Sequence, residues 1–219
     1  MSMTSQSGLL TEEECYRQLR NSIIDGTLMP NQHLVEMDLV KSFNASRATI
    51  RTVLARLEQE GLVERERYRG ARVRRISQEE AVEILEVRAA LESLIARHAA
   101  LRATEDDIVE LNQILARLRA CYERNDLLGY SEQNAALHRK LATIANHGTA
   151  KRLLDTLNSQ SVRFQYRTIM SQGRPEHSLR EHTEIVTAIA AKDPDGAEKA
   201  MKIHLSHVCD TLRTMNQKV

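Results

Sequence analysis

The chain has 219 residues, 42% of them hydrophobic and 28% charged, which is enough for one large or two modest globular domains. Aromatic residues make up only 3%, while Leu, Ala, Ile, Glu and Arg are frequent, so we expect a mostly helical protein with no sheet beyond a hairpin. The three cysteines are widely separated, no run of about 18 apolar residues occurs, and the first residues lack the basic start of an export signal. We therefore expect a cytoplasmic protein with no membrane partner.

The net charge of +1 conceals a basic segment. Residues 41–77 contain ten Lys or Arg against four Asp or Glu, a local charge of +6. Basic runs are commonly no more than a solvated face of a protein. The helical pattern within this segment favours nucleic acid instead.

The first third of the chain predicts three helices and a hairpin. Thr11 is a suitable N-cap for a helix that runs to about Asp25. Apolar spacing predicts a second helix over residues 34–43, and a turn over residues 44–46 leads to a third, which Ser46 caps and Gly61 ends. Alternating residues on both sides of Arg69-Gly70 predict a β-hairpin, the wing of a winged helix-turn-helix.

The third predicted helix has one apolar side and one basic side. Its apolar stripe comprises Ile50, Val53, Leu54 and Leu57. The other faces carry Arg47, Thr49, Arg51 and Arg56. Arginine neutralises phosphates and can bind guanine through two hydrogen bonds, so residues 34–75 predict binding to double-stranded DNA.

Several motifs in this region resemble the N-terminal domain of GntR-type bacterial transcription regulators. They are Leu39-Val40, the run from Ser46 to Arg51, the run from Leu54 to Glu58, and the run from Glu60 to Val63. The resemblance implies a winged helix-turn-helix domain over residues 1–77. It implies that Ser46, Arg47, Thr49 and Arg51 contact bases or phosphates, and that Arg69 and Gly70 place the wing tip in the minor groove. Met37 and Ala48 depart from the family pattern, which leaves the half-site sequence open.

From Ser77 onward the pattern predicts long amphipathic helices. We place them at residues 78–102, 104–124, 126–146, 149–171, 175–191 and 194–216. Thr104, Pro175 and Pro194 mark helix starts, and no repeat period is present. Residues 78–219 should therefore form an all-α helical bundle.

Three histidines face the interior of this bundle on a helical wheel. His138, His182 and His204 each lie in the apolar stripe of a different helix, and Asn134 shares the interior side of His138. Three separately hydrogen-bonded core histidines would explain the pattern, but one metal ion would satisfy all three rings together. Arg88 also lies in an apolar stripe and would need an anionic partner, either a ligand or Glu92 one turn further on.

The second half of the chain resembles the FCD effector domain of the FadR-like branch of GntR regulators. The resemblance rests on Asn134-x3-His138, Glu181-His182, Asp193-Pro194 and His204-Leu205. It implies a divalent metal ion, Zn²⁺ or Ni²⁺, held by Asn134, His138, His182 and His204 beneath a cavity for a small carboxylate that Arg88 binds. Asn134 stands where metal-binding members have an aspartate, so its carbonyl oxygen would coordinate without a negative charge.

Together these features predict a homodimeric transcription regulator that reads a pseudo-palindromic operator and senses a small organic acid, with a bound metal ion as part of the sensor. The main alternative is a metal-dependent, hydrolase-like enzyme with a DNA-binding appendage, because three histidines with an open position also describe a catalytic zinc site. No HExxH motif accompanies them. A non-specific nucleoid protein is a third reading, which the acidic remainder of the chain disfavours.

Overall fold

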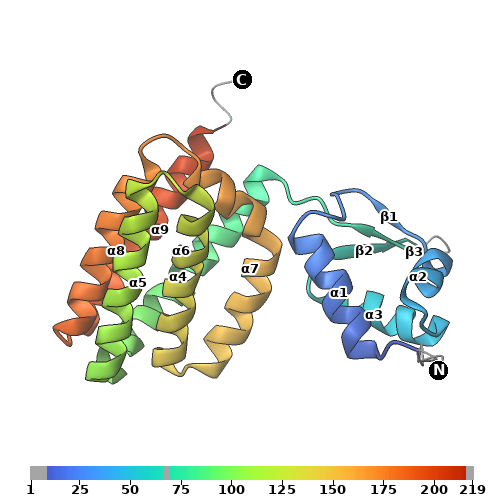
Figure 1. The fold of residues 1–219 in the computed structure, drawn as a ribbon, viewed down its shortest axis with the longest axis horizontal. Helices are drawn as coiled ribbons and strands as arrows, with labels where there is room; N and C mark the ends of the chain where they lie inside the picture. The colour runs from blue at the N-terminus through green and yellow to red at the C-terminus, as the bar shows by residue number, and fades with distance from the viewer. Residues whose placement is uncertain (1–8, 67–69, 216–219) are drawn as a thin grey trace, which may run out of the picture. The chain divides into compact units, whose positions relative to one another are not determined.

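The protein divides into two compact units, residues 1–76 and residues 77–219. The structure, a computed structural model, describes residues 9–66 and 70–215. The first unit combines short helices with a small sheet, and the second consists of long helices (Figure 1). The predicted fold class, a winged helix-turn-helix followed by an all-α bundle, is confirmed.

The helices of the first unit are α1 (Glu12–Ile24), α2 (Glu36–Phe43) and α3 (Arg47–Gln59). Thr11 caps α1 in a capping box, because its hydroxyl accepts the amide N–H of Glu14 while the Glu14 carboxylate accepts that of Thr11. Ser46 caps α3 by accepting the amide N–H of Thr49. Both predicted N-caps are therefore confirmed.

The sheet has three antiparallel strands in the order β1-β3-β2: β1 (His33–Leu34), β2 (Val63–Glu66) and β3 (Gly70–Val73). Strands β2 and β3 form the predicted hairpin, with Val63 opposite Val73. The prediction that a helix begins at Leu34, and that no strand exists beyond the hairpin, is wrong. Leu34 pairs with Ala71 in β1 and is only 3% exposed, because the free edge of β3 offers hydrogen bonds and a buried place for its side chain.

A single apolar core joins the helices and the sheet of the first unit. It includes all four residues of the predicted apolar stripe of α3 and apolar residues from α1, α2 and the three strands. The stripe residues Ile50, Val53, Leu54 and Leu57 are each 1% exposed or less. This packing fixes the rotation of α3, so its remaining faces are the ones available for DNA.

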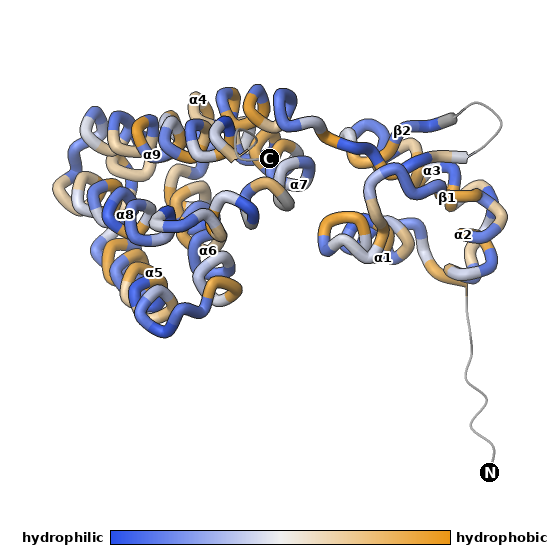
Figure 2. The backbone as a smooth tube through the Cα atoms, turned by 90° about the horizontal axis from the view of Figure 1, so that it is seen from above, coloured by the Kyte–Doolittle hydropathy of each residue, from blue (hydrophilic) through white to orange (hydrophobic). Residues whose placement is uncertain are grey.

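The second unit consists of α4 (Gln78–Arg102), α5 (Glu105–Glu123), α6 (Leu127–Ala145), α7 (Gly148–Ile169), α8 (Arg174–Ala190) and α9 (Pro194–Thr214). These bounds agree with the predicted helices to within about two residues at either end. Hydrophobic and hydrophilic stretches alternate along these helices (Figure 2), as expected where each helix turns one face to a shared core.

Helix α4 is the central element of the bundle. It packs against α6, α7, α8 and α9, so its side chains are buried on more than one side. Two charged residues, Arg88 and Glu92, lie in its buried middle section. Isolated charges are costly to bury, so these two side chains need partners inside the bundle. Helix α4 therefore places a polar site in the interior.

Candidate functional site

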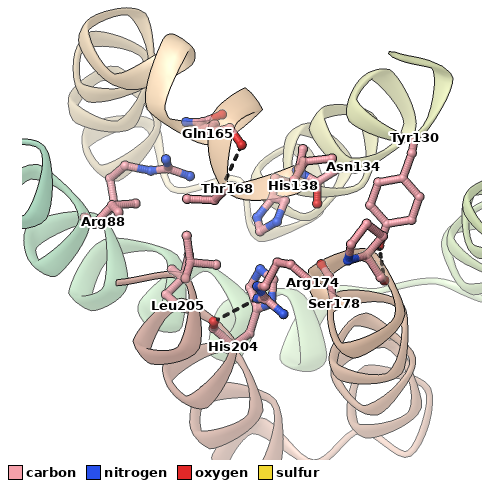
Figure 3. Close-up of a pocket in the computed structure, with 14 residues that line it drawn as sticks. Arg88, Tyr130, Asn134, His138, Gln165, Thr168, Arg174, Ser178, His204 and Leu205 are labelled. Carbon is pink, nitrogen blue, oxygen red and sulfur yellow. Dashed lines mark hydrogen bonds between the residues drawn. The ribbon is translucent and has the colours of Figure 1, made fainter. Parts of the chain in front are cut away.

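A cavity opens in the helical unit between α4, α6, α7, α8 and α9. The space between its lining atoms is about 440 Å³ when open solvent is included, and about 40 Å³ of it admits the centre of a water molecule. The polar and charged residues that line it are Arg88, Tyr130, Asn134, His138, Gln165, Thr168, Arg174, Ser178 and His204 (Figure 3). Leu85, Ile169, Pro175, Leu205 and Val208 complete the lining. A small cavity with a few convergent polar groups is typical of a ligand site.

Three histidines meet at this cavity. His138 of α6, His182 of α8 and His204 of α9 each offer one ring nitrogen, and these three atoms lie within 4.8 Å of one another. The ring centroids of His182 and His204 are 4.4 Å apart, and that of His138 is 5.4 Å and 5.5 Å from them. The structure thus brings together the three histidines that helical periodicity placed in the interior.

Glu92 orients the first of these rings. His138 Nδ1 donates to Glu92 Oε2 at 2.5 Å, while Arg88 Nε and Nη2 donate to Glu92 Oε1 at 2.9 and 2.6 Å. Burial raises the pKa of Glu92, but the Arg88 guanidinium and His138 outweigh that effect and hold the pKa well below its usual range. The carboxylate therefore stays ionised, and His138 keeps Nε2 free of this contact.

Glu181 orients the second ring in the same way. His204 Nδ1 donates to Glu181 Oε2 at 2.7 Å, and Arg174 Nη2 donates to the same oxygen at 2.8 Å. His207 Nδ1 donates to Glu181 Oε1 at 2.7 Å. Burial raises the pKa of Glu181, but the hydrogen bonds from His204 and Arg174 lower it to about 2.

His182 differs from the other two rings, because neither of its ring nitrogens has a hydrogen-bond partner among the described residues. Its side chain is fully buried. Burial, together with the neighbouring His204 and His138, lowers the pKa of His182 well below its usual value, and burial lowers that of His204 to about 4 although Glu181 opposes the shift. His182 and His204 are therefore neutral near pH 7, and a buried imidazole without a partner leaves an unmet bonding requirement.

This donor set fits a divalent metal ion. Metal-bound histidines usually donate the second ring N–H to a carboxylate, as His138 does to Glu92 and His204 does to Glu181. Their Nε2 atoms and a nitrogen of His182 then remain available as ligands, and imidazole nitrogens are ligands that suit Zn²⁺ and Ni²⁺. Asn134 lies one turn before His138 on α6 and lines the same cavity (Figure 3).

Arg88 lines the cavity as expected, and it also has the internal partner that the sequence left as an alternative. Its side chain is buried and is bound to Glu92 through Nε and Nη2. Its third nitrogen, Nη1, is buried with no partner among the residues that the structure describes. The internal ion pair therefore leaves a donor for a ligand.

Three further residues of the site were missed by the sequence reading. Arg174 and Glu181 form a buried pair, and Tyr130, which is fully buried, donates its hydroxyl to the carbonyl oxygen of Pro175 at 3.0 Å. Arg174 precedes Pro175, where the predicted helix begins, so a helical wheel gives no direction for its side chain. Glu181 is adjacent to His182 and is expected only as part of the Glu181-His182 motif, without a role of its own.

The first unit presents the predicted DNA-reading residues at the start of α3. Ser46, Arg47 and Arg51 are exposed there, and Thr49 is half-buried. Ser46 Oγ and Thr49 Oγ1 are 2.8 Å apart and hydrogen bonded. Arg47 Nε and Arg51 Nε donate to the two oxygens of Glu36 on α2, at 3.4 and 3.3 Å.

Arg56 lies apart from this group. Its guanidinium stacks 3.4 Å from the ring centroid of Tyr16, and Nη1 donates to Glu13 Oε2 at 2.7 Å, so it joins the last turn of α3 to α1. Gly70 begins β3 and has a φ of 94°. Arg69 lies outside the described residues.

No helix among the described residues is both long and apolar enough to cross a membrane.

Comparison with known proteins gives two family matches that together span most of the chain. Residues 11–73 match the model of the bacterial regulatory proteins of the gntR family, and residues 83–207 match that of the FCD domain. A curated relative, the HTH-type transcriptional repressor RspR of Escherichia coli, is 30% identical over 206 residues, which cover 94% of this chain and 90% of that protein. The HTH-type transcriptional repressor NanR of Cronobacter sakazakii is 27% identical, covering 95% and 86%.

Solved structures share the fold. McbR/YncC of E. coli superposes with a TM-score of 0.75 at 17% identity, covering 94% of this chain and 98% of that one. A GntR-type regulator of Rhodococcus sp. RHA1 gives a TM-score of 0.70 at 23% identity, covering 93% and 98%. At these identities the likeness supports the fold alone.

Proposed function

Because the chain belongs to the GntR family of bacterial regulatory proteins and carries an FCD domain, it is a DNA-binding transcription regulator, and we propose that its helical unit senses a small organic acid with the help of a divalent metal ion. The observation that carries this proposal is the convergence of three imidazoles from three helices, with both nitrogens of His182 left without a partner among the described residues. The named relatives are transcription regulators, so the enzymatic alternative has no support from them.

The proposed metal ligands are His138, His182, His204 and the carboxamide oxygen of Asn134. The fit rests on the two carboxylates that fix the His138 and His204 rings and on the unmet nitrogens of His182. When bound, the ion would supply a positive centre that attracts an anionic ligand. Asn134 contributes no charge, so metal affinity should be lower than with a carboxylate at this position.

The proposed effector site is the cavity above these ligands, and Arg88 is its carboxylate-binding residue. Buried arginine donors pair strongly with carboxylates. Nη1 of Arg88 has no partner among the described residues, and the side chain lines the cavity. An acid held there would contact α6, α8 and α9, which supply the proposed metal ligands, and α4, which supplies Arg88.

The proposed output is a change in operator affinity. Ser46, Arg47, Thr49 and Arg51 would read one half-site from the major groove, and a homodimer would place two such helices on a pseudo-palindromic operator, with Arg69 and Gly70 at the wing. Effector binding would shift the population between two arrangements of the DNA-binding units. We expect Arg56 to stabilise the first unit, because its guanidinium is already bound to Glu13 and stacked on Tyr16.

Metal loading tests the sensor half of the proposal. The full chain is stripped with chelator, and its thermal unfolding is followed with added Zn²⁺ or Ni²⁺. A ligand at about 100 times its dissociation constant should stabilise the fold by roughly 2.7 kcal/mol. His182→Gln should abolish this response, whereas His177→Gln, at an exposed position of the same helix, should leave it intact. Equal responses in both variants would exclude the proposed ligand set.

A binding selection tests the DNA half. Duplexes enriched from a random library by the full chain should share a two-fold motif. Arg47→Ala and Arg51→Ala should each weaken binding to the enriched duplex by roughly five- to a hundredfold, the worth of one base-reading arginine. Intact binding in both variants would rule out this reading helix.

A further inference from the structure

Two chains of charged side chains run through the helical unit with the same order of groups. One links Arg88, Glu92 and His138, and the other links Arg174, Glu181 and His204. In each, a buried glutamate accepts from an arginine and from the Nδ1 of a proposed metal ligand. Arg88 comes from α4 and Arg174 from the start of α8, and both line the cavity (Figure 3).

Each arginine has a buried terminal nitrogen that these chains leave unused. Nη1 of Arg88 and Nη1 of Arg174 are both buried, and neither has a hydrogen-bond partner among the residues described. Arginine stays protonated, and an unmet buried donor on a charged group is costly. The glutamates do not meet this requirement: the oxygens of Glu92 accept from Arg88 and His138, and those of Glu181 from Arg174, His204 and His207. Two residues of the cavity lining thus each carry a buried nitrogen that lacks an acceptor among the described residues.

We propose that Arg174 is a second acid-binding residue, so that the effector is a dianion with one acidic group at Arg88 and the other at Arg174. This inference rests on the proposed sensor function and narrows its ligand from an organic acid to a dicarboxylic acid. The sequence motifs do not identify Arg174 as an acid-binding residue. Its position on the cavity lining and its unused Nη1 do.

The charges of the site favour the same ligand class. Two arginines and two glutamates cancel formally, and a divalent ion would add two positive charges to a largely buried site. A monocarboxylate would leave one of these uncompensated, whereas a dicarboxylate would neutralise both. Since uncompensated buried charge is strongly unfavourable, the doubly charged ligand should be preferred.

Pairs of acids that differ in one carboxyl group test the dianion proposal on the full chain loaded with Zn²⁺. Calorimetric titrations would compare unbranched dicarboxylates from malonate to adipate, each with the monocarboxylate of the same chain length. We expect at least one dicarboxylate to bind roughly tenfold or more tightly than its monocarboxylate partner, the worth of one charge-assisted hydrogen bond. Monocarboxylates that bind as tightly as their partners would overturn the dianion inference while leaving the sensor function in place. If no acid of either kind binds, both the inference and the proposed sensor function fail.

The variant Arg174→Gln then tests whether Arg174 causes the preference for dicarboxylates over monocarboxylates. It should weaken dicarboxylate binding more than monocarboxylate binding and so remove the advantage of the dicarboxylate, because Arg88 still holds one acid group. Arg180→Gln, at an exposed position of the same helix, should keep the preference. Equal weakening of both acids in a folded Arg174→Gln variant would contradict the assignment. If the glutamine variant unfolds, Arg174→Lys replaces it in the test. Lysine keeps a positive charge beside Glu181 but lacks the second terminal nitrogen of arginine, so this variant too should lose the preference for dicarboxylates.

Discussion

The carboxylate of Glu36 accepts the Nε–H of Arg51 at 3.3 Å, and its other oxygen accepts that of Arg47 at 3.4 Å. One residue of α2 thereby holds both arginines of the proposed reading helix. Glu36 is mostly shielded, with its side chain 15% exposed, while the two arginine side chains are 60% and 65% exposed. Glu36 is thus a positioning residue for side chains that are expected to meet DNA.

Glu36→Gln should lower sequence discrimination. Loss of a negative charge near phosphates should strengthen binding to an unrelated duplex, while the freed arginines contact bases less accurately. We expect the affinity ratio between an enriched duplex and a scrambled one to fall by roughly three- to tenfold, since each exposed pair contributes at most about 1 kcal/mol. Fluorescence anisotropy at fixed salt measures both affinities. Asp38→Asn removes the same charge from an exposed position of α2 and should leave the ratio unchanged; an equal fall there would show a charge effect alone.

Gly70→Ala should destabilise the first unit. Gly70 has a φ of 94°, and a Cβ at this position would lie 2.5 Å from the carbonyl oxygen of Leu34 in β1. The left-handed backbone alone costs a residue with a Cβ about 1–2 kcal/mol, and the contact adds to it because a backbone oxygen in the sheet cannot move aside freely. Thermal or urea unfolding measures the loss.

Gly148→Ala is the matched control for this change. Gly148 begins α7 without a positive φ, and its nearest neighbour would be the side chain of Arg152 at 3.6 Å. Alanine there should leave stability unchanged or raise it by up to about 1 kcal/mol. If Gly70→Ala is equally harmless, the close approach of β1 and β3 does not constrain this position, and a role of Gly70 in DNA contact alone would explain the glycine.

Helical periodicity predicted the part of the site that depends on which way a helix faces. His138, His182 and His204 converge because each lies in an apolar stripe that must face the core. Periodicity carries no information on contacts between helices, so the stacking of Arg56 on Tyr16 was missed. A two-residue strand such as β1 is too short to show alternation, so Leu34 was assigned to the helix that follows it.

Asn134→Asp should tighten metal binding. The change adds a negative charge at a proposed ligand with almost no change in size. Even at the dielectric constant of water, two charges about 4 Å apart attract by about 1 kcal/mol, so affinity should rise roughly fivefold or more. Competition with a chromophoric chelator measures it. Gln133→Glu adds the same charge one residue earlier, where the side chain binds Arg117 of α5, and should change metal affinity little. An equal gain in both variants would remove Asn134 from the ligand set.

Asp107 should make the stability of the helical unit depend on pH in the acid range. Its Oδ1 is 2.8 Å from Lys140 Nζ on α6, and its Oδ2 completes the capping box of α5 with Thr104. The hydrogen bond with Lys140, followed by the backbone N–H of Thr104, lowers the pKa of Asp107 to about 2 from a usual value of 3.8. A lowered folded-state pKa means that this stabilisation is fully present above about pH 4 and is lost as pH falls toward 2.

Asp107→Asn should therefore cost about 1 kcal/mol near pH 7, once solvent screening is allowed for, and the difference from the unaltered chain should shrink as pH falls from about 4 toward 2. Urea unfolding at a series of pH values measures both effects. Asp106→Asn alters the neighbouring exposed aspartate, for which the structure shows no partner on α6. This variant should still lose stability as pH falls from about 4 toward 2, as the unaltered chain does. A difference for Asp107→Asn that stays constant down to pH 2 would mean that its effect comes from the lost helix cap and not from the ionised pair with Lys140.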